Sequence, residues 1–261
     1  MRTLLVGCGN MGRALLDGWL AARVLAPAEV TVLDPLATPP EGVAIVREPP
    51  AARFDLVVLA IKPQQFGELA PDLAPLADGA LVLSILAGTS CAQLAAGLPG
   101  ARVARIMANL AAAFGQSPVA LFASPGILSE PDRVLLDRLG GALGELQWLT
   151  NEEQFHAFIA LGGSGPGFVY RLLEAFAKGG AELGIEPGAS AAMALAMVRG
   201  AGELAARSGA DFGELAARVA SPGGTTRAGL DELERDGAAD RLVAATLRAA
   251  RDRSAEMARS G

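Results

Sequence analysis

Three glycines near the N-terminus have the spacing of a phosphate-binding turn. Gly7, Gly9 and Gly12 form the pattern G-x-G-x-x-G within the hexapeptide GCGNMG. The first allows a tight turn, the second lets a diphosphate approach the backbone, and the third allows a helix to pack closely on a strand. The N-terminus of a helix after this turn would offer unpaired N–H groups and partial positive charge. Gly7, Gly9, Asn10, Met11 and Gly12 are therefore predicted to bind a dinucleotide cofactor.

An acidic residue follows the second predicted strand, at the position that lies beside the adenosine ribose in dinucleotide-binding folds. Asp34 lies 22 residues beyond Gly12 and could accept hydrogen bonds from the adenosine ribose hydroxyls. The 2′-phosphate of NADPH would be repelled by this carboxylate, and the next four residues include no arginine to neutralise it. The cofactor is therefore NADPH or NADH, with NADH expected to be preferred. The alternative is that Asp34 only caps a turn before Pro35 and faces solvent.

Polar residues also follow two further predicted strands. Ala60, Lys62 and Pro63 come at the end of a strand expected over residues 56–61, and Asn109 comes after one expected over residues 103–107. Ligands bind at the carboxyl ends of the strands in open parallel sheets. All four are predicted to line the cofactor site, and the Asn109 amide could bond a nicotinamide carboxamide or the substrate.

A second candidate site lies far along the chain, in the hexapeptide SPGGTT at residues 221–226. A proline and two glycines favour an exposed turn, and the helix expected from Thr225 would present its N-terminus to an anion. A small carboxylate would fit against Ser221, Gly224, Thr225 and Thr226. The alternative is a capped helix with a glycine-rich loop and no ligand.

The elements that must position these residues fall into two halves. Residues 1–150 alternate short apolar runs with Ala/Leu-rich stretches, which predicts an α/β Rossmann-type domain with a mostly parallel sheet. Its strands are expected at residues 3–6, 30–33, 56–61, 80–85, 103–107, 118–122 and 146–149.

Residues 151–261 have no strand signal and are predicted to form an all-helical domain for substrate binding and dimerisation. The segment 189–207 is small and apolar on nearly every face, which a solvent-facing helix would not be. A homodimer or larger oligomer is therefore expected, although burial inside one subunit is an alternative.

Composition excludes several classes of protein. A net charge of −6 argues against a nucleic-acid-binding surface. The two cysteines, Cys8 and Cys91, are far apart and belong to no metal-binding pattern, so no metal is expected. Glycine, proline and polar residues interrupt every uncharged stretch, so no membrane span is expected. The N-terminus has no cleavage-site pattern, which predicts a cytoplasmic protein.

With these motifs in place, the sequence resembles the pyrroline-5-carboxylate reductase family over almost its whole length. The segments that carry the resemblance are GCGNMG at 7–12, AIKP at 60–63, SILAG at 84–88, GSGP at 163–166 and SPGGTT at 221–226. It implies hydride transfer from NAD(P)H to 1-pyrroline-5-carboxylate, giving L-proline. It also implies that Ser221, Gly224, Thr225 and Thr226 hold the substrate carboxylate, that Thr226 acts in catalysis beside the ring nitrogen, and that dimers assemble into a decamer.

The chain departs from the family pattern in one loop. Where the family typically reads Met-Pro-Asn-Thr-Pro, this chain has MANLA at residues 107–111, which keeps Asn109 but loses both prolines. This loop suggests one alternative, a silent paralogue that only binds NAD(P). Two others stay open independently of it: a reductase of a larger cyclic imine, and a β-hydroxyacid dehydrogenase with Lys178 as its acid/base group. The sole histidine, His156, is expected to be structural.

Overall fold

The computed structural model describes residues 1–260 and divides them into two compact units. The first unit comprises Met1–Ser164 together with the described residues from Ala250 onward, and the second comprises Gly165–Ala249. Each unit is described by itself. The domain boundary predicted at residue 150 stays a prediction. No helix in the described part of the chain is both long and apolar enough to cross a membrane.

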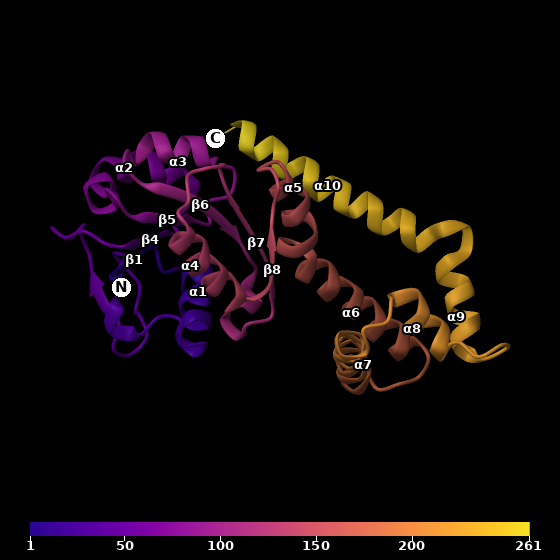
Figure 1. The fold of residues 1–261 in the computed structure, drawn as a ribbon. Coiled ribbons are helices and arrows are strands. Elements are labelled where there is room, and N and C mark those ends of the chain that lie inside the picture. The colour runs from indigo at the N-terminus through magenta and orange to yellow at the C-terminus, as the bar shows by residue number, and fades with distance from the viewer. Residues whose placement is uncertain (261) are drawn as a thin grey trace. The chain divides into compact units, whose positions relative to one another are not determined.

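An eight-stranded sheet forms the centre of the first unit, in the order β3-β2-β1-β4-β5-β6-β7-β8 (Figure 1). Every neighbouring pair is parallel except β6 and β7. The first six positions have the strand order of a doubly wound Rossmann sheet, which confirms the predicted fold class. The strands are β1 (Thr3–Val6), β2 (Val30–Leu33), β3 (Ala44–Val46), β4 (Leu56–Leu59), β5 (Leu81–Ser84), β6 (Arg102–Met107), β7 (Ser117–Ala123) and β8 (Gly144–Trp148).

Seven of these strands agree with the predicted ranges to within two residues at each end, but β3 was not predicted. It is only three residues long, lies at the edge of the sheet and follows the proline pair at 39–40. So short a run carries little periodicity. Its omission matters for the cofactor site, because β3 places the residue that follows it beside the end of β2.

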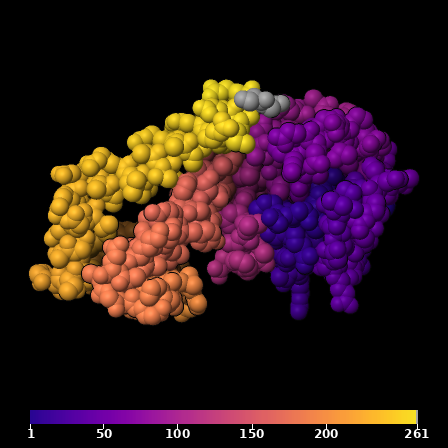
Figure 2. Space-filling model, turned by 180° about the vertical axis from the view of Figure 1, so that it is seen from behind, coloured from indigo at the N-terminus to yellow at the C-terminus, as the bar shows by residue number. Residues whose placement is uncertain are grey.

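Helices cover both faces of the sheet because its strands are apolar on both sides. Helices α1 (Asn10–Ala21) and α4 (Glu130–Gly141) pack on one face, and α2 (Pro63–Ala77) and α3 (Cys91–Gly97) pack on the other. The indole N–H of Trp19 on α1 donates to the Leu139 carbonyl of α4 at 2.9 Å, so this buried ring is both packed and hydrogen-bonded. Figure 2 shows the surface of most of this unit, in indigo to magenta, from the side opposite to that of Figure 1.

Four short helical segments also belong to the first unit. They are the 3₁₀ turns η1 (Pro27–Glu29) and η2 (Leu110–Phe114), helix α5 (Gln154–Phe158) and the π-helical segment η3 (Ile159–Gly163). The last turns of α10 (Ala238–Ser260) also belong to this unit.

The second unit is entirely helical, as predicted. It contains α6 (Gly165–Glu182), α7 (Pro187–Ser208), α8 (Phe212–Val219), α9 (Thr225–Glu234), the 3₁₀ turn η4 (Arg235–Gly237) and the first part of α10. Helices α6 and α7 form a hairpin, in which the buried Ser190 hydroxyl donates to the Ala177 carbonyl at 2.8 Å. On α7, Met193, Leu195 and Met197 are exposed in the single chain, so burial inside one subunit does not account for them.

Candidate functional site

The glycine-rich turn lies between β1 and α1, and two of its glycines are required by close backbone contacts. Gly7 has a φ of +88°, and a Cβ there would lie 2.7 Å from the Ala60 carbonyl oxygen at the end of β4. A Cβ on Gly12 would lie 2.4 Å from the Gly7 carbonyl oxygen. The structure thus brings the turn against Ala60, as predicted for one edge of the sheet.

Gly9 differs from its two neighbours because nothing lies within 4 Å of a Cβ built on it. It is the N-cap of α1, no side chain caps the helix, and the first turn holds no acidic residue. The N–H groups of Asn10 and Met11 therefore lie at a helix N-terminus that has room for an anion. These features fit the diphosphate of a dinucleotide.

Asp34 is bound into the turn rather than facing solvent freely. Its carboxylate accepts hydrogen bonds from the N–H groups of Cys8 at 2.8 Å, Leu36 at 2.8 Å and Ala37 at 2.9 Å. Partial burial alone would raise the pKa of Asp34, but these three donors, with Arg47 nearby, hold that pKa below its usual value. Asp34 is therefore an ionised acceptor in a fixed position beside the glycine-rich turn.

The four residues after Asp34 include no arginine, but two arginines from other elements bond to this segment. Arg47 Nη1 donates to the Asp34 carbonyl at 2.6 Å and to the Ala37 carbonyl at 3.2 Å, and Arg13 Nη1 donates to the Thr38 carbonyl at 3.3 Å. Arg47 lies beside Asp34 because β3 pairs with β2, with Leu33 opposite Val46, and each residue directly follows its strand. Arg13 and Arg47 could neutralise a 2′-phosphate that Asp34 would repel. The preference for NADH inferred from Asp34 therefore stays a prediction.

A substitution of Asp34 tests this preference directly. Asp34→Ser removes the charged acceptor and leaves Arg13 and Arg47, so we expect the ratio of dissociation constants, NADPH to NADH, to fall by about tenfold or more. Isothermal titration of both cofactors measures the ratio, with Asp72→Ser on the exposed side of α2 as the control. An unchanged ratio would show that Asp34 does not discriminate.

Lys62 and Pro63 lie where the sequence predicts them, directly after β4. Pro63 begins α2 and Lys62 is its N-cap, with the Lys62 backbone N–H donating to Gln65 Oε1 at 3.1 Å. The Lys62 side chain is exposed. This helix start faces the same edge of the sheet as the glycine-rich turn, because β1 and β4 are parallel neighbours. A contact of Lys62 with the cofactor stays a prediction.

Asn109 also lies after its predicted strand, but its side chain is already engaged. Its Nδ2 donates to the Gly162 carbonyl at 2.8 Å, and its Oδ1 accepts from the Ala111 N–H at 2.9 Å. The residue is buried, and its backbone N–H donates to Ser117 Oγ at 2.9 Å. Asn109 thus fastens η2 to the π-helical segment η3, and its predicted contact with nicotinamide or substrate stays a prediction.

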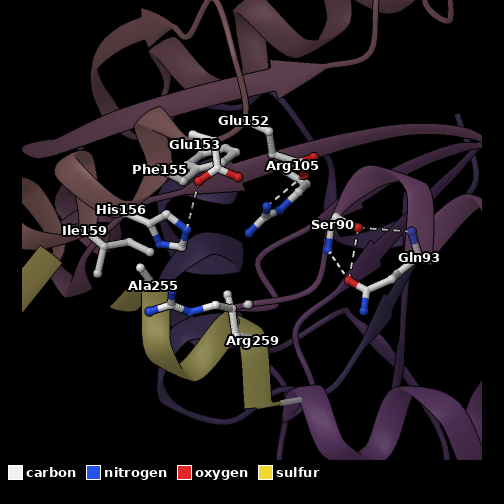
Figure 3. Close-up of a pocket in the computed structure, with 12 residues that line it drawn as sticks. Ser90, Gln93, Arg105, Glu152, Glu153, Phe155, His156, Ile159, Ala255 and Arg259 are labelled. Atoms are coloured by element: carbon white, nitrogen blue, oxygen red, sulfur yellow. Dashed lines mark hydrogen bonds and ion pairs between the residues drawn. The ribbon is translucent and has the colours of Figure 1, made fainter. Parts of the chain in front are cut away.

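The structure also contains a buried ion pair that the sequence argument missed. The Arg105 side chain on β6 is only 6% exposed; its Nη1 donates to Glu152 Oε1 at 2.8 Å and its Nη2 to the Leu86 carbonyl at 3.3 Å (Figure 3). Its guanidinium lies over the Phe155 ring, 4.6 Å from the centroid. Glu152 also accepts from the Cys91 N–H at 2.7 Å. The pair therefore joins three segments: strand β6, residues 84–90, and the residues just before α5.

The signal for this pair was present in the sequence. An arginine in the middle of the apolar strand RVARIM lies between two covered faces, and a buried charge needs a partner. The position of that partner could not be read, because Glu152 is 47 residues away.

In the second unit, residues 221–226 form an exposed turn that opens α9 at Thr225, as predicted. The Gly224 N–H donates to the Ser221 carbonyl at 2.9 Å, and Gly223 has a φ of +69°. Gly224 is the N-cap, no side chain caps α9, and its first turn contains no acidic residue. The N–H groups of Thr225 and Thr226 therefore lie at a second helix N-terminus with the character of an anion site.

Lys178 does not have the surroundings of an acid/base group. It lies exposed on α6, and its Nζ forms an ion pair with Glu174 Oε1 at 2.5 Å, one turn away on the same helix. A surface ion pair of this kind contributes little to stability and is common on exposed helix faces. The dehydrogenase alternative therefore gains no support.

Two family models match different parts of the chain. Residues 3–88 match the family described as "NADP oxidoreductase coenzyme F420-dependent", and residues 152–257 match "Pyrroline-5-carboxylate reductase dimerisation". The chain is 33% identical to a pyrroline-5-carboxylate reductase of Glycine max, over 97% of this chain and 94% of that one. It is 34% identical to one of Pseudomonas aeruginosa, over 98% and 97%.

Solved structures give the same result. A pyrroline-5-carboxylate reductase of Coxiella burnetii has a TM-score of 0.89 at 26% identity, covering 98% of both chains. A pyrroline carboxylate reductase of Plasmodium falciparum, solved with NADP bound, has a TM-score of 0.86 at 22% identity, covering 99% of this chain and 98% of that one. The resemblance seen in the motifs is confirmed, and the chain belongs to the pyrroline-5-carboxylate reductase family.

Proposed function

We propose that this protein is an NAD(P)H-dependent oxidoreductase that reduces 1-pyrroline-5-carboxylate to L-proline, the last step of proline biosynthesis. The observation that carries the proposal is a pair of open helix N-termini, at Gly9 on α1 and at Gly224 on α9, each uncapped and free of acidic residues. One suits a diphosphate and the other a small carboxylate. The full-length relatives bear this reductase name.

The residues of the chain act mainly by binding and orientation. Gly7, Gly9 and Gly12 admit the cofactor diphosphate, and Asp34 accepts from the adenosine ribose. When bound, the reduced nicotinamide supplies the hydride. The imine nitrogen can take its proton before the hydride arrives at C5, so the site needs no strong acid, and positioning supplies much of the rate.

The 221–226 loop holds the substrate in this scheme. Its N–H groups bind the carboxylate, with contacts to Ser221, Gly224 and Thr225, and the Thr226 hydroxyl orients the ring nitrogen. The turn is closed by its own hydrogen bond, from the Gly224 N–H to the Ser221 carbonyl at 2.9 Å, with Gly223 at a positive φ. A preformed turn loses less freedom on binding.

The active form in this proposal is a homodimer or a larger oligomer. Exposed apolar side chains gather on α6 and α7, among them Tyr170, Leu172, Phe176, Met193 and Leu195. Large exposed apolar surfaces mark sites of protein association. The second unit also lies within the segment that matches the dimerisation family. The decamer implied by resemblance and the cytoplasmic location both stay predictions.

Thr226→Ala tests the reaction and the loop together. We expect kcat/KM for 1-pyrroline-5-carboxylate to fall by about tenfold or more, because the hydroxyl that orients the ring nitrogen is lost. Thr226→Ser keeps that hydroxyl and should retain most of the activity. Loss of nicotinamide absorbance measures turnover with NADH and NADPH.

The control is Thr246→Ala, which removes an exposed threonine on α10 whose hydroxyl bonds only the Leu242 carbonyl of its own helix. Unchanged turnover in Thr226→Ala would remove this residue from catalysis. Nucleotide binding by the wild type without turnover on the imine would instead reject the proposed reaction and favour the silent paralogue.

A further inference from the structure

A cavity of about 400 Å³ lies in the first unit, between α3, α5 and the last turns of α10 (Figure 3). None of the residues predicted to bind cofactor or substrate lines it. Its volume lies within the range of about 300–1,000 Å³ that is typical of small-molecule sites. The side chains that determine its chemistry are Arg105, His156, Ile159, Ala255, Ala258 and Arg259.

Two cations face each other across this cavity. Only Glu152 and the Leu86 carbonyl accept from the buried Arg105 guanidinium, although a guanidinium has five N–H donors. Its Nε has no acceptor, and a terminal nitrogen points into the open space toward Arg259 (Figure 3). Within residues 1–260 no carboxylate pairs with Arg259. Because the Arg105 Nε is itself covered, the terminal guanidinium nitrogens of Arg105 and Arg259 are the donors that this wall offers to a ligand.

The two acidic residues of the cavity wall, Glu152 and Glu153, have partners other than Arg259. Glu152 is held by Arg105 and by the Cys91 N–H. Glu153 is 89% exposed, and its carboxylate lies 3.7 Å from His156 Nε2. Neither carboxylate is paired with Arg259, which is exposed, so a negative group of a ligand would find this guanidinium unpaired.

One part of the remaining wall is apolar. It is formed by Ile159 of η3 and by Ala255 and Ala258 of α10, and Phe155 lies beneath the Arg105 guanidinium. Ser90 and Gln93, at the start of α3, add polar atoms elsewhere in the wall. A ligand with one anionic end and a compact apolar body would match the arginines and the apolar part.

We propose that this cavity binds a small organic carboxylate, with the carboxylate between Arg105 and Arg259 and the apolar body against Ile159 and the α10 alanines. The site is separate from the proposed substrate loop and goes beyond the proposed function. Because α10 supplies Arg259, Ala255 and Ala258, and because Ser254 Oγ lies 2.9 Å from His156 Nδ1, the ligand fastens the end of α10 to the first unit.

His156 gives this proposal a selective reporter, since it is the only histidine of the chain and lies in the cavity wall. We would label histidine with ¹³C at Cε1 and titrate the full-length protein with cyclopentanecarboxylate, following the His156 resonance by NMR. Cyclopentanecarboxamide tests the need for charge, and inorganic phosphate tests the need for an apolar body. None of residues 221–226 lines the cavity that contains this reporter.

The variants are Arg259→Ala and the matched control Arg251→Ala, whose arginine lies on the same helix and pairs with Asp252. We expect a saturable shift in the wild type and in Arg251→Ala, an affinity weakened by about tenfold or more in Arg259→Ala, and no saturable shift with the amide or phosphate. No saturable shift in the wild type, equal affinity in Arg259→Ala, or equal binding of phosphate or the amide would overturn the proposal. The readout needs no turnover, so it stands apart from the test of the reaction.

Discussion

Glu152→Ala is expected to lower the free energy of unfolding by about 3 kcal/mol, because it leaves the Arg105 guanidinium buried without its countercharge. The Arg105 side chain is 6% exposed and the Glu152 side chain 25% exposed, so water screens the pair only partly. The change also removes the acceptor of the Cys91 N–H at the start of α3. Because Glu152 is partly exposed, we expect a loss at the lower end of the range of about 3–5 kcal/mol that is typical of breaking a buried ion pair.

Glu153→Ala is the matched control for this measurement. It removes a carboxylate from the next residue, but that side chain is 89% exposed and contacts only His156, at 3.7 Å. A change within about 0.5 kcal/mol is expected there. Urea unfolding of both variants should be compared at one protein concentration, because association makes apparent stability depend on concentration. Equal losses in the two variants would contradict the role assigned to the Arg105–Glu152 pair.

Glu152→Gln separates charge from hydrogen bonding at the same position. The amide oxygen can still accept from Arg105 and from the Cys91 N–H, but it supplies no negative charge. An intermediate loss of stability is expected. A loss as large as that of Glu152→Ala would mean that the charge, rather than the two hydrogen bonds, stabilises this junction.

The parallel sheet could be predicted because its central strands are covered on both faces and read as apolar runs. The runs at residues 56–59 and 81–84 have every side chain buried, so the sequence there has little freedom. The three-residue edge strand Ala44–Val46 has no fully buried side chain and carries no such pattern. Missing it also removed Arg47 from the expected surroundings of Asp34.

In the candidate sites, too, local features could be predicted from the sequence and contacts between distant segments could not. The turns that begin α1 and α9 were predictable, because glycine and proline spacing is a local property of the chain. Contacts such as Arg105 with Glu152, or Asn109 with the Gly162 carbonyl, join segments 47 and 53 residues apart and depend on the folded arrangement. Residue type alone indicated that Arg105 needed a partner, but topology determined which one.

The second large effect is expected when Gly9 and Gly12 are each replaced by alanine, because the two glycines are required for different reasons. The Gly9 backbone is extended, with φ −70° and ψ −165°, and no atom lies within 4 Å of the added methyl group. Gly9→Ala should therefore fold with a stability within about 1 kcal/mol of the wild type. Its methyl group would nevertheless occupy the space through which a diphosphate approaches the backbone, so cofactor affinity should fall by about tenfold or more.

Gly12→Ala should lose both stability and affinity. Its Cβ would lie 2.4 Å from the Gly7 carbonyl oxygen and 3.1 Å from Ala60 Cβ, so α1 must move away from the turn. Overpacking of this kind costs about 1–3 kcal/mol. Thermal unfolding and fluorescence titration with NADH distinguish the two variants. Wild-type affinity in Gly9→Ala would place the diphosphate elsewhere, because the open space above Gly9 would then have no function in binding.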